Sequence, residues 1–110
     1  MAKFVIFFSL NAQTIQRFIE NPSDRAAAVR TLLEPMGGKL EGYYFMFGPD
    51  DGMVIVDVAD SNAAAAISLA VSSTGAFSHV RTHELIPAEN LNAVLERAKS
   101  ARASYRPPGA

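Results

Sequence analysis

Residues 39–59 contain two strand-like segments separated by a short polar turn. The segments are KLEGYYFMF (39–47) and MVIVDVA (53–59), and GPDDG (48–52) lies between them. Proline fixes φ, aspartate hydrogen-bonds its own backbone and glycine tolerates positive φ, so these residue types favour a tight turn. This segment is therefore predicted to be a β-hairpin, and turn formation is the simplest role for Asp50.

Hydrophobic spacing predicts a strand on each side of this hairpin and helices between the strands. Residues 3–10 (KFVIFFSL) are mostly aromatic or β-branched, which favours a buried central strand, and residues 77–86 are a fourth predicted strand. The predicted helices are a short polar one over 13–19, one that Asn21-Pro22 opens and that ends near Gly37, an alanine-rich one over 62–73, and a last one over 87–103.

The resulting order is β-α-β-β-α-β with an extra C-terminal helix, which predicts an α+β, ferredoxin-like fold with an antiparallel sheet. Right-handed crossovers place both crossover helices on one face of the sheet, so the other face stays bare. The side chains expected on the bare face are Phe7, Tyr43, Phe45, Met53 and Ile55. An apolar face of this kind predicts a second copy as partner, in a homodimer or higher homo-oligomer built as a dimeric α/β barrel.

Length and composition limit the classes of partner. A chain of 110 residues suits one domain, here 1–103, with 104–110 as a flexible C-terminal tail. A formal net charge of −1 offers little attraction for nucleic acid or anionic lipid, and no apolar run reaches the ~20 residues that a bilayer requires. The absence of cysteine excludes disulfides and thiol chemistry. We expect a cytoplasmic protein without a cofactor that binds neither nucleic acid nor membranes.

The stretch HVRTH (79–83) has the spacing of a metal motif without its geometry. Histidines four residues apart on a strand lie ~13 Å apart, because a strand rises ~3.3 Å per residue, so no metal site is predicted. Alternation places His79, Arg81 and His83 on one face, where a fixed charge between two imidazoles suits an anion or carboxylate. The alternative is a row of rim residues held by water and by carboxylates of a partner chain.

Asp57 is unusual because it lies in the middle of a strand, between Val56 and Val58. If the valines face the helices, Asp57 points into the interior of the barrel, where a carboxylate must be paired, raised in pKa or hydrated. We hypothesise a small polar pocket lined by Tyr43, Asp57, His79 and Arg81. The alternatives are a structural ion pair and a bond across the dimer interface.

Several local motifs resemble those of the GYD-domain family, small proteins of the dimeric α/β-barrel group. They are the apolar first strand, GGKLEGYYFMFG (37–48) leading into a Gly-x-x-Asp hairpin, VIVDVAD (54–60) before an alanine-rich helix, and a threonine-containing fourth strand before a Pro-Glu helix start. Gly48 and Asp51 match the signature of the family, whereas Asp50 stands where the family has tyrosine. The resemblance covers about residues 3–97 and implies a ferredoxin-like fold and self-association. It assigns no catalytic residue.

Three functions remain open at the level of sequence. The first is a homo-oligomeric module that binds a small molecule or acts in regulation. The second is a cofactor-free enzyme, such as an oxygenase, isomerase or dehydratase acting on a small carbonyl or phenolic compound, with His79 or Asp57 as general base and Arg81 stabilising negative charge. The third is an assembly module whose barrel is filled by side chains. An enzyme requires a base in an open cavity, whereas a binding module requires only the cavity.

Overall fold

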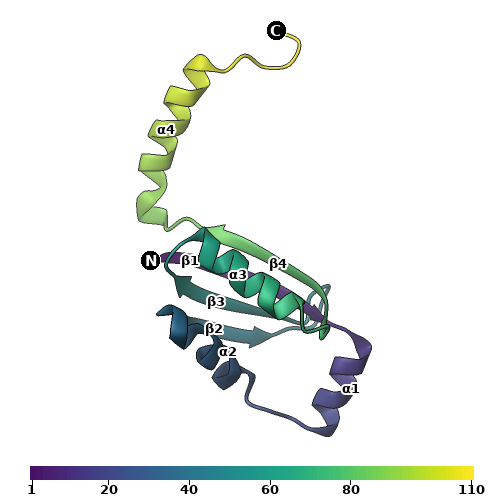
Figure 1. The fold of residues 1–110 in the computed structure, drawn as a ribbon. Helices are drawn as coiled ribbons and strands as arrows, with labels where there is room; N and C mark the ends of the chain where they lie inside the picture. Colours follow the sequence, from purple (N-terminus) through teal and green to yellow (C-terminus); the bar gives the residue numbers. More distant parts are fainter.

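A computed structural model describes all 110 residues as one four-stranded antiparallel sheet with helices on one side (Figure 1). The elements in chain order are β1 (Ala2–Leu10), α1 (Ala12–Glu20), α2 (Arg25–Leu33), the 3₁₀ turn η1 (Glu34–Met36), β2 (Lys39–Phe45), β3 (Gly52–Val58), α3 (Ser61–Ser72), β4 (Phe77–Leu85), the 3₁₀ turn η2 (Ala88–Asn90) and α4 (Leu91–Ser104). The strands are arranged β2-β3-β1-β4, so the predicted ferredoxin-like α+β fold is confirmed.

β1 is the apolar central strand that the sequence predicts, since it pairs with both β3 and β4. Ile6 lies opposite Val54 on one side and Thr82 on the other. Every second residue of β1 and β3 is buried beneath the helices. This core contains Phe4, Ile6, Phe8, Val54, Val56 and Val58 from the sheet and Leu33, Ala64 and Ile67 from the helices.

The two crossover helices cover the same face, as right-handed connections require (Figure 1). α2 packs on the edge strand β2, and α3 packs mainly on the opposite edge strand β4. The predicted start of α2 at Asn21-Pro22 is wrong, because Asn21 ends α1 and Asp24 caps α2 by accepting a hydrogen bond from the Ala27 amide at 3.0 Å. The predicted exit is confirmed at Gly37, whose φ of 66° suits glycine.

β2 contains an irregularity that reverses the faces of its second half. The register with β3 skips Glu41, because Leu40 lies opposite Val56 and Gly42 lies opposite Ile55. A β-bulge of this kind places an extra residue on one strand and shifts the alternation by one. Tyr43 and Phe45 therefore lie on the helix-covered face, which corrects the prediction that they lie on the bare one.

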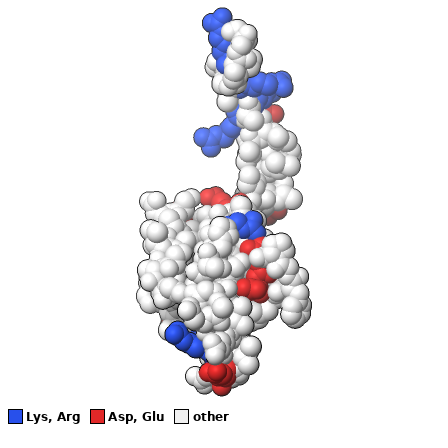
Figure 2. Space-filling model, turned by 90° about the vertical axis from the view of Figure 1, so that its right-hand side faces the viewer, with Lys and Arg blue, Asp and Glu red and all other residues white.

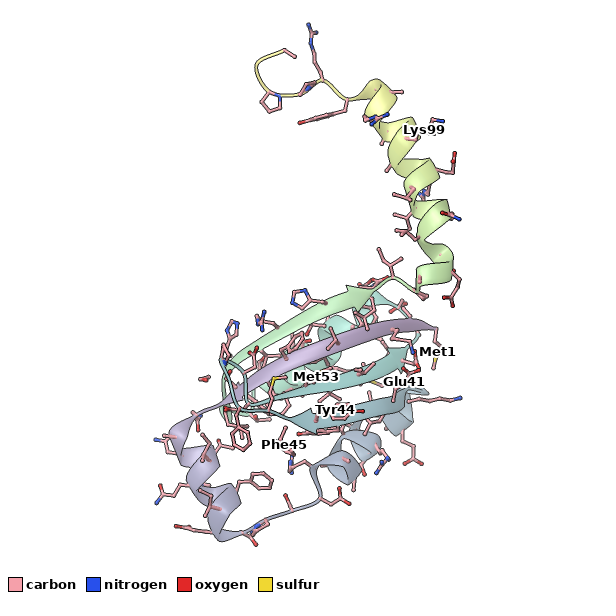
Figure 3. The ribbon with its side chains drawn as sticks, turned by 180° about the vertical axis from the view of Figure 1, so that it is seen from behind. Met1, Glu41, Tyr44, Phe45, Met53 and Lys99 are labelled. Carbon is pink, nitrogen blue, oxygen red and sulfur yellow. The ribbon has the colours of Figure 1, made fainter.

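The uncovered face carries Val5, Phe7, Tyr44, Met53 and Ile55, and the figure seen from that side shows Tyr44 and Met53 on it (Figure 3). Phe7, Met53 and Ile55 were predicted there from alternation. Tyr44 takes the place expected for its neighbour, and more than half of its surface is accessible to solvent.

α4 projects away from the rest of the chain and packs mainly on the turn η2 that precedes it (Figure 1). It carries an apolar stripe that faces solvent, with Leu91, Val94 and Leu95 all exposed. Basic side chains gather on this arm, while the body shows a broad uncharged surface in the same view (Figure 2). No helix combines the length and the apolar character needed to cross a bilayer.

Candidate functional site

An aromatic cluster occupies the helix-covered face at the end of the sheet near α1. Phe8 is its centre, with ring centroids 5.9 Å from Tyr43, 6.2 Å from Phe45 and 5.6 Å from Phe77, each in an edge-to-face arrangement. Phe18 of α1 stacks at 5.8 Å from Phe45. Aromatic pairs are favourable beyond the area that they bury, and the tilted Phe18–Phe45 pair is the one that connects α1 with the sheet.

A cavity of about 600 Å³ lies between this cluster and the helices. It exists because α2 and α3 pack on opposite edge strands and leave the middle of the sheet between them uncovered. Its floor is formed by Ile6, Phe8, Tyr43, Phe45, Val54 and Val56, and its walls come from α1, α2, α3 and the segment before β4. The volume lies within the range of ~300–1,000 Å³ that is usual for small-molecule sites.

The rim of the cavity is polar and carries two arginines. Arg17 comes from α1 and Arg25 from the first turn of α2, and neither belongs to any of the ion pairs of the structure. Arg25 donates only a long hydrogen bond, 3.3 Å, to the Ser23 hydroxyl. Glu20 is the one acidic side chain of the lining. The rim therefore has an excess of positive charge with free hydrogen-bond donors.

Tyr43 brings a phenol into the apolar floor. Burial raises the pKa of Tyr43 above its ordinary value, and the positive charge of Arg25 acts in the opposite direction. Arg25 is therefore close enough to the phenol to act on it. Tyr43 and Arg25 together form the polar end of the cavity, and Arg17 of α1 also belongs to its lining.

The predicted pocket of Tyr43, Asp57, His79 and Arg81 does not form. Tyr43 is on the opposite face of the sheet because of the bulge at Glu41. Asp57 and Arg81 share the bare face, but they lie far apart along it. Lys3 lies opposite Asp57 on one side and Leu85 on the other, and Arg81 is four residues from Leu85 along β4. At ~3.3 Å per residue, this places them ~13 Å apart along the strand direction alone.

Asp57 belongs to a local ionic cluster, the structural-pair alternative of the sequence analysis. Lys3 pairs with Glu41 and also with Asp57, whose Oδ1 lies 3.4 Å from the Lys3 ammonium nitrogen. Hydrogen bonding with the Glu41 carboxyl and the Lys3 ammonium lower the pKa of Asp57. The hydrogen bond between Lys3 and Glu41 is the main reason why the pKa of Lys3 is raised. This cluster lies at the end of the sheet opposite the aromatic cluster.

Arg81 pairs with Asp50 of the hairpin, a partner that turn chemistry alone does not reveal. The Asp50 side chain is buried, and the guanidinium carbon of Arg81 lies 5.0 Å from the centre of the Phe7 ring. His83 meets the same ring edge-on at 6.1 Å, and His79 lies opposite Ser9. The three residues of the predicted cationic row share one face, but a carboxylate of the same chain already occupies the central arginine.

The residues of the family motif hold the hairpin against β1. The Asp51 carboxylate accepts a hydrogen bond of 2.7 Å from the Leu10 amide, and the Asp51 amide donates one of 2.8 Å to the Phe8 carbonyl. Asp51 thus bonds backbone groups where the hairpin meets the sheet. Gly48 lies in the bend between β2 and β3, with no heavy atom within 4 Å of where its side chain would begin.

Sequence reasoning missed Arg17 and Arg25, although one signal was available for α1. Thr14, Arg17, Phe18 and Asn21 follow one another at spacings of i, i+3, i+4 and i+7, so they share one side of the helix, and all four line the cavity. A helix side that only packs on a core is usually apolar, so an aromatic residue among polar ones is unusual there. For Arg25 no comparable signal exists.

The fold and the cavity define a small α+β domain whose four-stranded sheet is bare on one face and holds a mostly apolar pocket beneath the helices on the other. The sequence profile of the GYD domain matches residues 4–95, and the chain belongs to the GYD-domain family. No curated protein matches the sequence.

Two solved structures share the fold. One is described as the crystal structure of FFRP-DM1, with a TM-score of 0.55, 16% sequence identity and coverage of 78% of this chain and 100% of the other. The second is the hypothetical protein PHS023 from Pyrococcus horikoshii, with a TM-score of 0.50, 15% identity and coverage of 82% and 95%. At these identities the likeness concerns the fold alone.

Proposed function

We propose that this GYD-domain protein is a homo-oligomeric module that binds a small molecule in the cavity beneath its helices. The observation that carries the proposal is a cavity of about 600 Å³ with an aromatic floor and a polar end. A cavity of this size inside so small a core exposes apolar side chains to water, and a ligand that covers them recovers the free energy of their burial.

Self-association is supported by two apolar surfaces that the chain does not cover itself. One is the bare face of the sheet, with Phe7, Tyr44 and Met53 near its centre. The other is the apolar stripe of α4. A helix of 14 residues is marginal by itself in water, so α4 requires packing that its own chain does not provide. A second copy offers apolar faces of the same kind to both surfaces.

Binding is favoured over a cofactor-free enzyme because neither base proposed from the sequence lies in the cavity. His79 and Asp57, the two candidate bases, lie on the bare face, on the other side of the sheet from the cavity. The lining contains no histidine, and its titratable groups are Arg17, Glu20, Arg25 and Tyr43. Binding without catalysis is also the simpler function for a pocket that is mainly apolar.

Filling the cavity tests this function. Ala28 of α2 lines the cavity, whereas Ala27 beside it does not, so Ala28→Trp and Ala27→Trp form a matched pair. The probe is the neutral dye N-phenyl-1-naphthylamine, whose fluorescence rises in apolar pockets. We expect Ala28→Trp to weaken dye binding at least about tenfold and Ala27→Trp to leave it unchanged.

Native mass spectrometry of freshly purified protein complements this test, because one spectrum reports both subunit number and any retained molecule. An oligomer carrying a discrete added mass that Ala28→Trp removes supports the proposal. Equal dye binding by both tryptophan variants, or a protein that remains monomeric, contradicts it.

A further inference from the structure

The polar end of the cavity restricts what kind of molecule fits there. The charged groups of its lining are Arg17, Arg25 and Glu20, and the Tyr43 hydroxyl lies beside Arg25. Across the whole chain, the ion pairs join Lys3 with Glu41 and Asp57 and Arg81 with Asp50, so both rim guanidiniums are free of ion pairs.

Free guanidinium groups at the mouth of an apolar pocket favour an anion with a planar, forked acceptor. Arginine presents donors in a fixed fork that matches a carboxylate, and it is more weakly hydrated than lysine, so it loses less on partial burial. The Tyr43 hydroxyl can donate a further hydrogen bond, since a phenol is protonated at neutral pH. Glu20 disfavours a second negative charge on the ligand.

The rest of the cavity lining is mainly apolar and aromatic. Phe8 and Phe45 form its floor, and Ile67 and Val71 of α3 form part of its wall. No charged side chain comes from α3 or from the strands that line it. A ligand body placed there must be apolar, and an aryl ring suits the edge-to-face geometry that already surrounds Phe8.

Resting on the proposed function, we propose that the ligand is a singly charged organic acid with an apolar body, of which an arylalkyl carboxylate is the simplest example. Its carboxylate lies between Arg25 and Arg17 and accepts from the Tyr43 hydroxyl. Its body lies on the Phe8 floor. The binding is non-covalent and requires no metal ion and no second substrate.

The test compares two ligands that differ only in charge. The probes are 6-phenylhexanoate and its primary amide, titrated separately into the full-length protein by isothermal calorimetry near neutral pH. We expect the acid to bind at least about tenfold more tightly than the amide, because charge-assisted hydrogen bonds to arginine are stronger than neutral ones. This preference should shrink as salt is raised, since both arginines are exposed to solvent.

Substitutions of the two rim arginines test whether they cause the preference for the acid over the amide. Arg25→Gln and Arg17→Gln should each reduce affinity for the acid several-fold and affinity for the amide by a smaller factor, so that the preference for the acid narrows. Arg25→Lys should recover part of the loss, because it restores the charge without the fork. Arg30→Gln is the matched control, since Arg30 lies on the same helix outside the cavity lining and should behave as the unchanged protein.

The outcomes separate the two proposals. If the acid and the amide bind equally, or if Arg30→Gln has the same effect as Arg25→Gln, the anion assignment is wrong while the pocket stands. If neither probe nor the neutral dye binds, the proposed function fails and this inference fails with it.

Discussion

Gly52 at the start of β3 packs against the ring of Phe8. A Cβ atom at Gly52 would lie 2.6 Å from Cε2 of Phe8 and 3.0 Å from the Tyr44 carbonyl oxygen. The ring cannot turn aside cheaply, because Phe8 is 4% exposed and is enclosed by the aromatic cluster. The residue type at position 52 thus sets how closely the hairpin approaches the floor of the cavity.

We expect Gly52→Ala to lower the free energy of unfolding by roughly 1–3 kcal/mol, the usual cost of overpacking a core. Urea denaturation measures this effect. Gly48→Ala is the matched control, since nothing lies within 4 Å of its added methyl group, and it should be close to neutral. Equal stability of the two variants would show that the Phe8 ring has room to move.

The cluster of Lys3, Glu41 and Asp57 makes a prediction about pH. The pKa of Asp57 in the folded protein lies below its ordinary value of 3.8. A lowered folded-state pKa contributes stability above the unfolded pKa, and this contribution is lost as pH falls through the folded pKa. The cluster therefore stabilises the fold at neutral pH and ceases to do so in acid.

Lys3→Met should raise the pKa of Asp57, because two neighbouring carboxyls then lack the cation between them. Carbon-detected NMR titration of the Asp57 carboxyl measures the change directly. Lys99→Met on α4 is the control and should leave the titration unaltered. An unchanged Asp57 titration in Lys3→Met would mean that Lys3 does not act on this carboxyl in solution.

α4 is the element that packs least on its own chain. Its side chains Leu91, Val94 and Leu95 are all exposed. A substitution in the stripe should therefore leave the intrinsic stability of the body unaltered and weaken only the contact with a second copy.

We expect Leu95→Lys to shift the protein toward smaller assemblies in sedimentation velocity experiments, with little change in the unfolding of the monomer. Ser100→Lys adds the same charge on the opposite side of α4 and should have no effect on assembly. If Leu95→Lys destabilises the monomer itself, α4 packs on its own chain in solution.

For the molecule as a whole, one sheet separates two different surfaces. The helix-covered face holds the cavity, and the bare face carries Phe7 together with Tyr44 and Met53, two of the residues labelled in Figure 3. A second copy on the bare face leaves the cavity and its arginines accessible from the other side. Assembly and ligand binding can therefore be changed independently.

Met53→Glu should break self-association, because it places a charge in the middle of the apolar face at a site partly buried already. Light scattering coupled to size exclusion measures the mass. Leu69→Glu, on the outer surface of α3, makes the same kind of change away from the face and should leave the mass unchanged. A dimer that persists in Met53→Glu would place the interface elsewhere, with α4 as the remaining apolar surface.

Much of the fold follows from local rules that act on the sequence. Alternation of Val54, Val56 and Val58 predicted the covered face of β3, and the apolar run of β1 predicted its central position. Turn residues predicted the hairpin, and Gly37 predicted the end of the helical segment after α2. Each of these inferences depends on neighbours a few residues away, which is why sequence sufficed.

The candidate site did not follow in the same way. One extra residue at Glu41 moves Tyr43 to the opposite face, and Gly42 beside it is a local signal too weak to fix the position of a bulge. Arg17 and Arg25 line the same cavity because α1 and α2 both border it. The sequence by itself therefore determined which elements form and which way β1 and β3 face, because those depend on short-range periodicity. Only the tertiary structure decided where the cavity lies and which charges meet at its mouth, because both depend on how whole elements pack against one another.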